Sequence, residues 1–138
     1  MRPSIVVSNY RIVRKILIAE DDFYILDIYK SAFAGAGYEV TTAENGEKVL
    51  ELLKINSYDV MLLDIMLPKV SGTEIINWCR AEKSPAKNLL IFALTNLDEA
   101  IFVKKVLDQG ANGYFVKAKI EPHALIERID AAIRSQNK

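Results

Sequence analysis

The sequence predicts an α/β fold, with a doubly wound sheet of five parallel strands and five helices that cover both of its faces. Three observations support this prediction. Short apolar runs alternate five times with longer segments of helical periodicity, the connections between them are short, and polar residues cluster just after the apolar runs. Such alternation is typical of parallel sheets, because two parallel strands need a crossover that is usually a helix.

The expected strands are short runs, most of them apolar on both faces, as in strands that lie inside a parallel sheet. They are residues 16–19, 38–42, 59–63, 89–94 and 111–116. The second run is the weakest because it mixes polar with apolar residues, and the third is strongly apolar.

The expected helices follow the strands and have apolar residues at spacings of three and four. The first carries Leu26, Tyr29 and Phe33 on one face, and Gly35 and Gly37 end it. The others are expected over residues 44–56, 73–82 and 98–109, and from residue 122 onward, where a proline suits the first helical position.

Length and composition fit one ordinary domain. The chain has 138 residues, of which 51% are hydrophobic, and its 18 basic and 18 acidic side chains cancel. This balance favours neither nucleic acid nor a membrane surface, and no apolar run approaches the roughly 18–20 residues that span a bilayer. One cysteine excludes an internal disulfide, so a cytoplasmic location is expected. Residues 1–14 are expected to form a tail or extra element, and residues 15–138 the domain, with no output domain after it.

Polar residues follow four of the five expected strands. They are Glu20, Asp21 and Asp22 after the first strand, Asp64 after the third, Thr95 and Asn96 after the fourth, and Lys117 after the fifth. In open α/β sheets the functional site lies beyond the carboxyl ends of the strands, so these residues are expected to meet at one edge.

These residue types together suit phosphoryl transfer. Clustered carboxylates repel one another, and a hard cation such as Mg²⁺, which prefers oxygen ligands, relieves that repulsion. A lysine can pair with a carboxylate or an incoming anion, and a threonine hydroxyl can donate to a phosphoryl oxygen. A carboxylate nucleophile, a metal, a cation and a hydroxyl donor are the parts that the reaction needs.

Four segments taken together resemble the receiver domain of two-component response regulators, the fold typified by the chemotaxis response regulator. In order they are KILIAEDD, YDVMLLDIMLPKVSG, LLIFALTN and GANGYFVK, and the resemblance runs from about residue 15 to residue 134. Each segment alone is a weak signal, whereas all four in this order are specific. The resemblance implies a flavodoxin-like (receiver) topology.

The resemblance also implies roles for individual residues. Asp64 matches the phospho-acceptor, Asp21 a direct Mg²⁺ ligand and Glu20 the second acid, which often acts through water. The backbone carbonyl of Met66 matches the third protein ligand of the metal.

Three further matches concern the switch. Thr95 matches the hydroxyl that moves to the phosphoryl group, Lys117 the lysine that pairs with it, and Tyr114 the aromatic ring that turns inward. By the same resemblance, the domain would catalyse its own phosphorylation and the slow hydrolysis of the resulting aspartyl phosphate.

The implied partners are a histidine kinase or histidine phosphotransfer protein, and a downstream protein that binds the face of the fourth helix, fifth strand and fifth helix. No nucleic acid or membrane partner is expected, and the chain is expected to be a monomer or weak dimer.

Two residues depart from the family pattern. Ala118 stands where a proline usually follows the lysine, so we expect a trans peptide and a shifted loop. Asn96 stands where the family commonly has alanine or glycine, and our hypothesis is that it slows phosphotransfer or hydrolysis.

Other interpretations compete with these. One alternative is a receiver-like interaction module that no longer uses phosphorylation. Ala118 and Asn96 favour this alternative, whereas the intact acids, Thr95 and Lys117 argue against it. An aspartyl phosphatase is disfavoured, because such enzymes commonly need an acid two residues after the nucleophile, where Met66 stands. Negative charge at a helix start also explains Asp22. His123 is expected at the surface, and packing explains Cys79.

Overall fold

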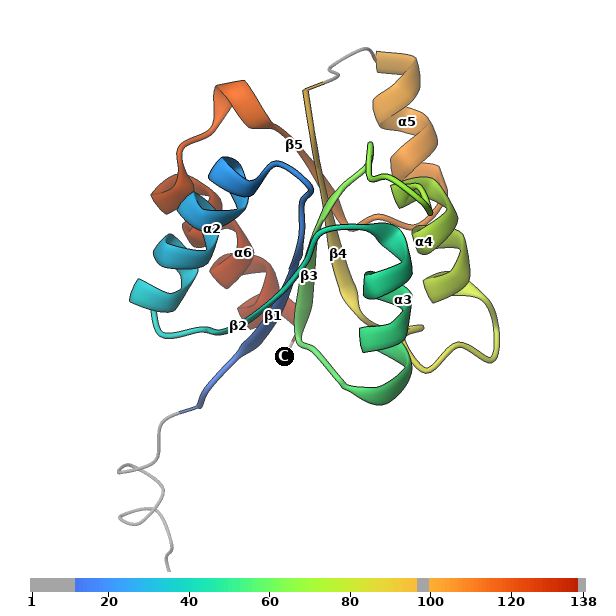
Figure 1. Cartoon of the computed structure of the whole chain (residues 1–138), viewed down its shortest axis with the longest axis horizontal. Helices are drawn as coiled ribbons and strands as arrows, with labels where there is room; N and C mark the ends of the chain where they lie inside the picture. The colour runs from blue at the N-terminus through green and yellow to red at the C-terminus, as the bar shows by residue number, and fades with distance from the viewer. Residues whose placement is uncertain (1–11, 97–99, 137–138) are drawn as a thin grey trace, which may run out of the picture.

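The computed structural model, which describes residues 12–96 and 100–136, contains one sheet of five parallel strands in the order β2-β1-β3-β4-β5 (Figure 1). The strands are β1 (Lys15–Ala19), β2 (Glu39–Ala43), β3 (Val60–Asp64), β4 (Leu90–Thr95) and β5 (Gly113–Val116). The predicted fold class is confirmed. The weakest predicted strand, β2, lies at one edge of the sheet, where a strand has one neighbour and needs less apolar surface.

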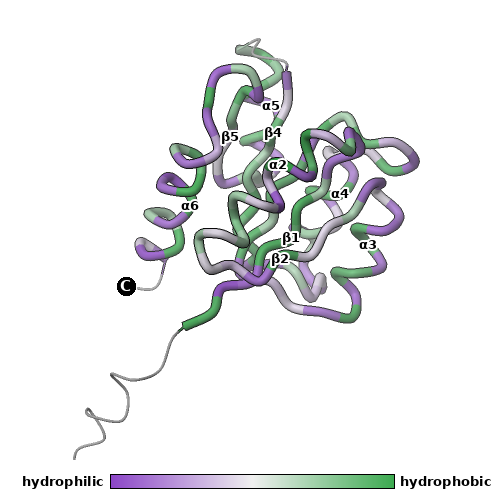
Figure 2. The backbone as a smooth tube through the Cα atoms, turned by 60° about the vertical axis from the view of Figure 1, so that its left-hand side comes forward, coloured by the Kyte–Doolittle hydropathy of each residue, from purple (hydrophilic) through white to green (hydrophobic). Residues whose placement is uncertain are grey.

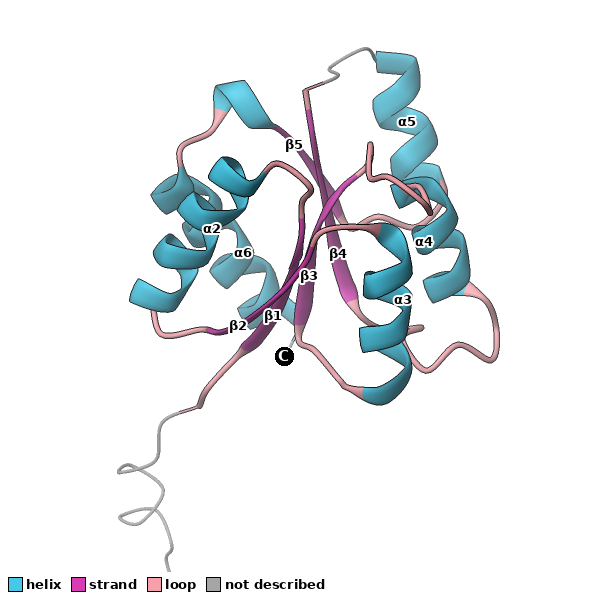
Figure 3. Ribbon diagram, in the orientation of Figure 1, coloured by secondary structure: helices cyan, strands magenta, loops and turns pink. Residues whose placement is uncertain are grey.

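Five α-helices cover the two faces of the sheet in the described part of the chain. They are α2 (Phe23–Gly35), α3 (Gly46–Ile55), α4 (Gly72–Arg80), α5 (Ala100–Asp108) and α6 (Pro122–Gln136). Helices α2 and α6 lie on one face, and α3, α4 and α5 on the other (Figures 1 and 3). Hydrophobic and hydrophilic residues alternate along the tube of α6, as its partial burial requires (Figure 2).

Two apolar cores result, one on each face of the sheet. The α2 and α6 side buries Phe33, Leu125 and Ile129 against the sheet, while the other side buries Ile75 and Ile76 of α4. Burying one such side chain stabilises the fold by about 1.5–3 kcal/mol. The middle strand β3 is buried along its whole length, so the position of its last residue is fixed by packing on both faces.

Side-chain caps set where three helices begin. Asp22, Asn45 and Ser71 are the N-cap residues of α2, α3 and α4, and each accepts a hydrogen bond from the backbone N–H three residues later. Helix α3 therefore begins at residue 46 rather than 44 as predicted. The predicted start of the fourth helix, at residue 98, lies outside the described residues.

Strand β5 begins at Gly113 rather than at residue 111 as predicted, because Asn112 forms hydrogen bonds to β4 and to α4. Its N–H donates to the Ile91 carbonyl (2.7 Å), and its Oδ1 accepts from the Ile91 N–H (2.8 Å) and from the Arg80 guanidinium (2.8 Å). Arg80 also donates to the Gly110 and Lys87 carbonyls, each at 2.9 Å. These contacts tie α4 to the start of β5, and the strand begins only after them.

Two remaining expectations concern membrane-spanning helices and the predicted tail at the N-terminus. No helix among the described residues is long and apolar enough to cross a membrane. Most of the predicted tail, residues 1–11, lies outside the described residues, so its separation from the domain stays a prediction. Arg14 already joins the domain, because its carbonyl accepts from the Glu39 N–H and its guanidinium lies 3.8 Å from Asp130.

Candidate functional site

The candidate site lies at the carboxyl edge of the sheet, where four strands deliver polar residues. Asp64 is the last residue of β3, and Thr95 is the last residue of β4. Glu20 directly follows β1, and Lys117 directly follows β5. Because β3 lies between β1 and β4 in the sheet, Asp64 has a polar neighbour on each side.

The Lys117 ammonium group joins the two most buried acids. Its Nζ lies 2.7 Å from Glu20 Oε1 and donates to Asp64 Oδ2 at 3.0 Å. The Glu20 side chain is 1% exposed and that of Asp64 is 4% exposed. Two buried carboxylates this close together would repel each other. The single positive charge of Lys117 offsets that repulsion and lets both acids stay buried.

Burial and pairing act against each other on both partners. Burial raises the pKa of the Glu20 carboxyl, and this effect exceeds the opposing effects of Lys117 and of the Asp22 N–H, which donates to Glu20 Oε2 at 3.0 Å. Burial lowers the pKa of the Lys117 ammonium, but the hydrogen bonds to Glu20 and Asp64 outweigh it, and the net pKa is raised. The lysine therefore stays protonated at neutral pH.

Three acids form a group whose geometry fits a divalent cation. Glu20, Asp21 and Asp64 each offer a carboxylate oxygen, and these oxygens lie within 4.8 Å of one another. Asp21 is exposed while the other two are buried, so the group opens to water on one side. Mg²⁺ prefers such oxygen ligands and keeps several waters, so this donor set fits it.

The backbone after Asp64 belongs to the same site. The Met66 N–H donates to Asp64 Oδ1 at 3.0 Å, which leaves each Asp64 oxygen with one donor. The Met66 side chain is exposed, whereas its backbone N–H contacts Asp64 directly.

Thr95 and Tyr114 lie on adjacent strands. Thr95 is buried and pairs with Val116 in the sheet register, whereas Tyr114 pairs with Ala93. The Tyr114 ring packs edge-on against Phe102 of α5, with 6.4 Å between centroids. A movement of Tyr114 would therefore act directly on α5.

The residues that depart from the family pattern lie around the site. No cis peptide occurs among the described residues, which confirms the expected trans bond between Lys117 and Ala118. The loop there forms a 3₁₀ turn, Lys117–Lys119, which the sequence did not predict, and Lys117 still reaches both acids. Asn96 is exposed beside Thr95.

Two other expectations concern residues away from the site. His123 is exposed, as predicted, with its nearest acid, Glu121, at 3.7 Å. Cys79 is fully buried in α4, and burial raises the pKa of its thiol to about 11, which fits packing and gives no reactive thiolate.

Sequence reasoning missed an apolar surface next to the acids. Phe23 and Tyr24, in the first turn of α2, are each 77% exposed, although aromatic side chains usually bury part of their surface. The same helix also lines a hollow of about 260 Å³, through Ile28 and Tyr29, and Lys117 of the site lines it from the other side. The sequence pattern does not show which aromatic side chains are exposed. This surface is therefore recognised only from the structure, where Phe23 and Tyr24 are both exposed.

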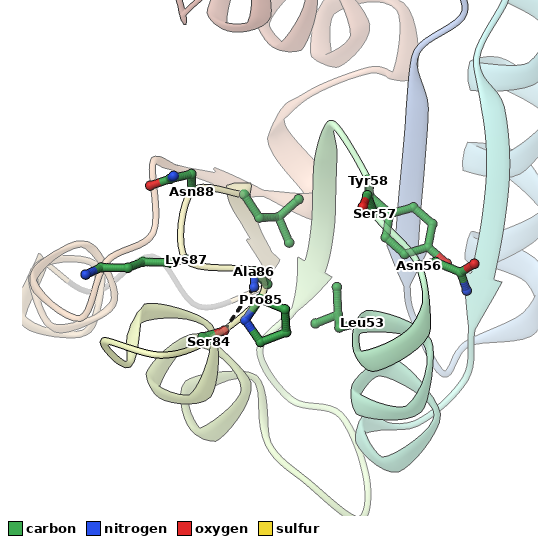
Figure 4. A pocket seen from close by; sticks show the side chains of 10 residues that line it. Leu53, Asn56, Ser57, Tyr58, Ser84, Pro85, Ala86, Lys87 and Asn88 are labelled. Atoms are coloured by element: carbon green, nitrogen blue, oxygen red, sulfur yellow. Dashed lines mark hydrogen bonds between the residues drawn. The ribbon is translucent and has the colours of Figure 1, made fainter.

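A second hollow, of about 270 Å³, lies at the opposite edge of the sheet (Figure 4). It is lined by residues 56–58 and 84–89 together with Leu53, and Ser84 Oγ accepts from the Ala86 N–H there. No acid lines this hollow, and Glu20, Asp21 and Asp64, the acids whose arrangement fits a cation, lie away from it at the carboxyl edge of the sheet.

Comparison with known proteins identifies the class that this fold and site define. The profile of the response regulator receiver domain matches residues 16–130, which is most of the chain. The chain therefore belongs to the receiver domain family of two-component response regulators. Receiver domains typically bind Mg²⁺ and interact with histidine kinases and downstream effectors.

Two relatives show how the domain is used elsewhere. The chain is 36% identical over 121 residues to a cyclic di-GMP phosphodiesterase of Thermotoga maritima, and 33% identical over 123 residues to the response regulator SaeR of Staphylococcus aureus. The matches cover 88% and 89% of this chain, but only 31% and 52% of those two proteins.

Solved receiver structures agree with the observed fold. The chemotaxis response regulator CheY4 of Vibrio cholerae superposes with a TM-score of 0.80 at 27% identity, covering 87% of this chain and 98% of that one. The receiver domain of the Francisella response regulator 1452 gives a TM-score of 0.81 at 28% identity, over 89% and 98%. The predicted flavodoxin-like receiver topology is confirmed.

Replacing Lys117 by methionine tests the central ion pairs. Loss of the cation leaves Glu20 and Asp64 buried with like charges, so we expect unfolding free energy to fall by roughly 3 kcal/mol at pH 7. Burial raises the pKa of Glu20 and Lys117 lowers it, so without the lysine that pKa rises further, and the folded variant takes up a proton there at a higher pH than the wild type does. The loss should therefore shrink as the pH falls, which urea unfolding at several pH values measures.

Lys104 provides the matched control, because its ion pair with Asp108 lies in solvent, with 77% and 64% of the two side chains exposed. Lys104→Met should leave stability nearly unchanged. Equal losses in the two variants would contradict a special role for the buried pairs.

Proposed function

We propose that this domain accepts a phosphoryl group on Asp64 and thereby switches a protein-binding surface. The observation that supports this best is the state of Asp64 itself. It is 3% exposed at a strand end, and each of its oxygens has one fixed donor, Met66 N–H or Lys117 Nζ. A buried carboxylate held beside two acids and a lysine is costly to maintain for stability alone, which argues for a functional role.

The chemistry begins with a phosphohistidine of the donor protein. A carboxylate oxygen of Asp64 attacks the phosphorus, a P–O bond forms, and the P–N bond breaks. The departing imidazole nitrogen takes up a proton, and Asp64 is left as an acyl phosphate. Lys117, already between Glu20 and Asp64, is placed to follow the new charge onto the phosphoryl oxygens, and the Thr95 hydroxyl can donate to another.

Mg²⁺ completes the proposed site. Asp21 and Asp64 would bind it directly, Glu20 through water, and Met66 through its backbone carbonyl. When bound, it supplies positive charge that offsets the repulsion between the carboxylates and the incoming phosphoryl group. The exposed side of the cluster, at Asp21, leaves room for its waters.

The proposed output passes through the face of α5, β5 and α6. Movement of Thr95 toward the phosphoryl group opens space that the Tyr114 ring would enter, and the contact between Tyr114 and Phe102 would pass this shift to α5. Ile101 of α5 is 86% exposed and would belong to the surface that a downstream protein reads. Phosphorylation then shifts a population between two states.

The partners and setting belong to the same proposal. The donor is a histidine kinase or a histidine phosphotransfer protein in the cytoplasm, and the domain acts as a monomer or weak dimer. A receiver-like module without phosphorylation is the alternative, and the preserved contacts of Lys117 with both acids weigh against it.

Acetyl phosphate provides the direct test of the acceptor. Incubation with acetyl phosphate and Mg²⁺ should give one phosphoryl adduct, measured by intact-protein mass. Asp64→Asn and removal of the metal by a chelator should both abolish the adduct. A wild-type protein that stays unmodified at every time point would contradict the proposal and favour the alternative module.

Our hypothesis is that Asn96 slows phosphotransfer or hydrolysis of the aspartyl phosphate, because its exposed amide directly follows Thr95 and would narrow the approach to Asp64. Asn96→Ala should shorten the lifetime of the adduct several-fold, measured by the decay of the phosphorylated mass. Asn88→Ala, an exposed asparagine at the opposite edge of the sheet, is the control. Equal lifetimes and equal rates of phosphorylation by acetyl phosphate in all three proteins would refute the hypothesis.

The surface of Phe23 and Tyr24 is expected to contact the donor protein, because it adjoins the acids and exposes aromatic side chains. Phe23→Ala should slow phosphotransfer from a phosphohistidine protein but leave the rate with acetyl phosphate unchanged. Ile55→Ala, with an apolar side chain that is also 77% exposed but lies at the far end of α3, should change neither rate. An equal rate with the protein donor for Phe23→Ala and wild type would contradict the assignment.

A further inference from the structure

The loop from Ile65 to Ser71 carries a ligand of the proposed metal site but is folded by contacts away from that site. Its Met66 N–H donates to Asp64 Oδ1, and the adjoining Met66 carbonyl is the proposed third ligand. Whatever fixes this backbone therefore fixes the oxygen that Mg²⁺ would contact.

The loop is tightly folded and includes an unfavourable conformation. The Val70 N–H donates to the Pro68 carbonyl and the Gly72 N–H to the Ile65 carbonyl, both at 2.9 Å. Lys69, between them, has a φ of 74°, in the left-handed region that residues other than glycine rarely adopt. Such conformations persist where surrounding contacts determine them.

Contacts from outside the loop come from the first turn of α3, which supplies no side chain to the acidic cluster. The Gly46 N–H donates to the Pro68 carbonyl at 3.1 Å, and the Glu47 carboxylate lies 3.4 Å from Lys69 Nζ. The first N–H groups of a helix have no partner within it, so the loop carbonyl satisfies one of them.

The approach at Gly46 is too close for any side chain. A Cβ there would lie 2.0 Å from the Val70 carbonyl oxygen and 2.6 Å from Val70 Cβ. The nearest obstacle is backbone, so an added methyl group must displace the loop or the helix. Gly46 is buried, and its φ lies outside the left-handed region, so close approach rather than backbone freedom accounts for a glycine here.

We infer that Gly46 is a positioning residue for the metal site. By letting the start of α3 contact the loop directly, it holds the Met66 carbonyl and the Met66 N–H in the geometry that binds Mg²⁺. This inference rests on the proposed function, because it concerns affinity for the metal of that site. Contacts that orient metal ligands commonly set affinity by 10–100-fold.

Gly46→Ala tests the inference, with Mg²⁺ affinity measured by calorimetry. We expect the Kd to rise by roughly tenfold. The phosphorylation rate with acetyl phosphate should fall at low Mg²⁺ and recover at saturating Mg²⁺, a split that general destabilisation does not produce. Gly35→Ala is the control, because a Cβ at Gly35 meets nothing within 4 Å. A folded Gly46→Ala protein with the wild-type Kd would overturn the inference.

A second measurement uses the wild-type protein, in case the variant does not fold. In a Mg²⁺ titration followed by ¹⁵N NMR, the Gly46 amide should shift with the same Kd as the Met66 amide, while the Gly35 amide stays in place. A Gly46 amide that does not shift at saturating Mg²⁺ would overturn the inference. A wild-type protein that binds no Mg²⁺ would instead contradict the proposed function, and the inference with it.

Discussion

The contact of Lys117 with Glu20 and Asp64 is the interaction on which the site depends. Two carboxylates buried side by side would cost several kcal/mol each without a counter-charge, and one lysine, 2.7 and 3.0 Å away, provides it. Lys117 pairs with the two buried acids, while Asp21, the third acid of the cluster, is exposed. A cation and its waters can therefore approach the cluster from the side of Asp21. Under the proposed function, an incoming phosphoryl group would meet a site that already holds the positive charge its oxygens need.

The fold makes this arrangement possible by placing strand ends, rather than flexible loops, around Asp64. Strand β3 is buried on both faces, so its final carboxylate has little freedom, and β1 and β4 bring Glu20 and Thr95 to its two sides. The loop after β3 is held from a different direction, by the first turn of α3. The site therefore has two supports: the sheet fixes Asp64, the proposed acceptor, and the contact at Gly46 holds the loop beside it.

Much of this was predictable because the sheet edge obeys a general rule. The apolar runs predicted the strands, and Glu20, Asp64 and Lys117 each follow one of these runs. Because the carboxyl ends of parallel strands share one edge, these residues were expected to lie close together. The late start of β5 was not predictable, because it depends on Arg80 reaching Asn112 across 32 residues. The contact at Gly46 also lacks a local signal, because its cause is the carbonyl of Val70, which lies in the loop after β3 and far from Gly46 in the sequence.

A crystal structure with Mg²⁺ and beryllium trifluoride, a mimic of the phosphoryl group, tests the central claim most directly. The account predicts the mimic on Asp64, with Lys117 Nζ contacting a fluorine atom while it keeps Glu20, and the Thr95 hydroxyl donating to another fluorine. A structure in which the mimic is absent from Asp64 at saturating concentration, or in which Lys117 lies away from it, would contradict the account.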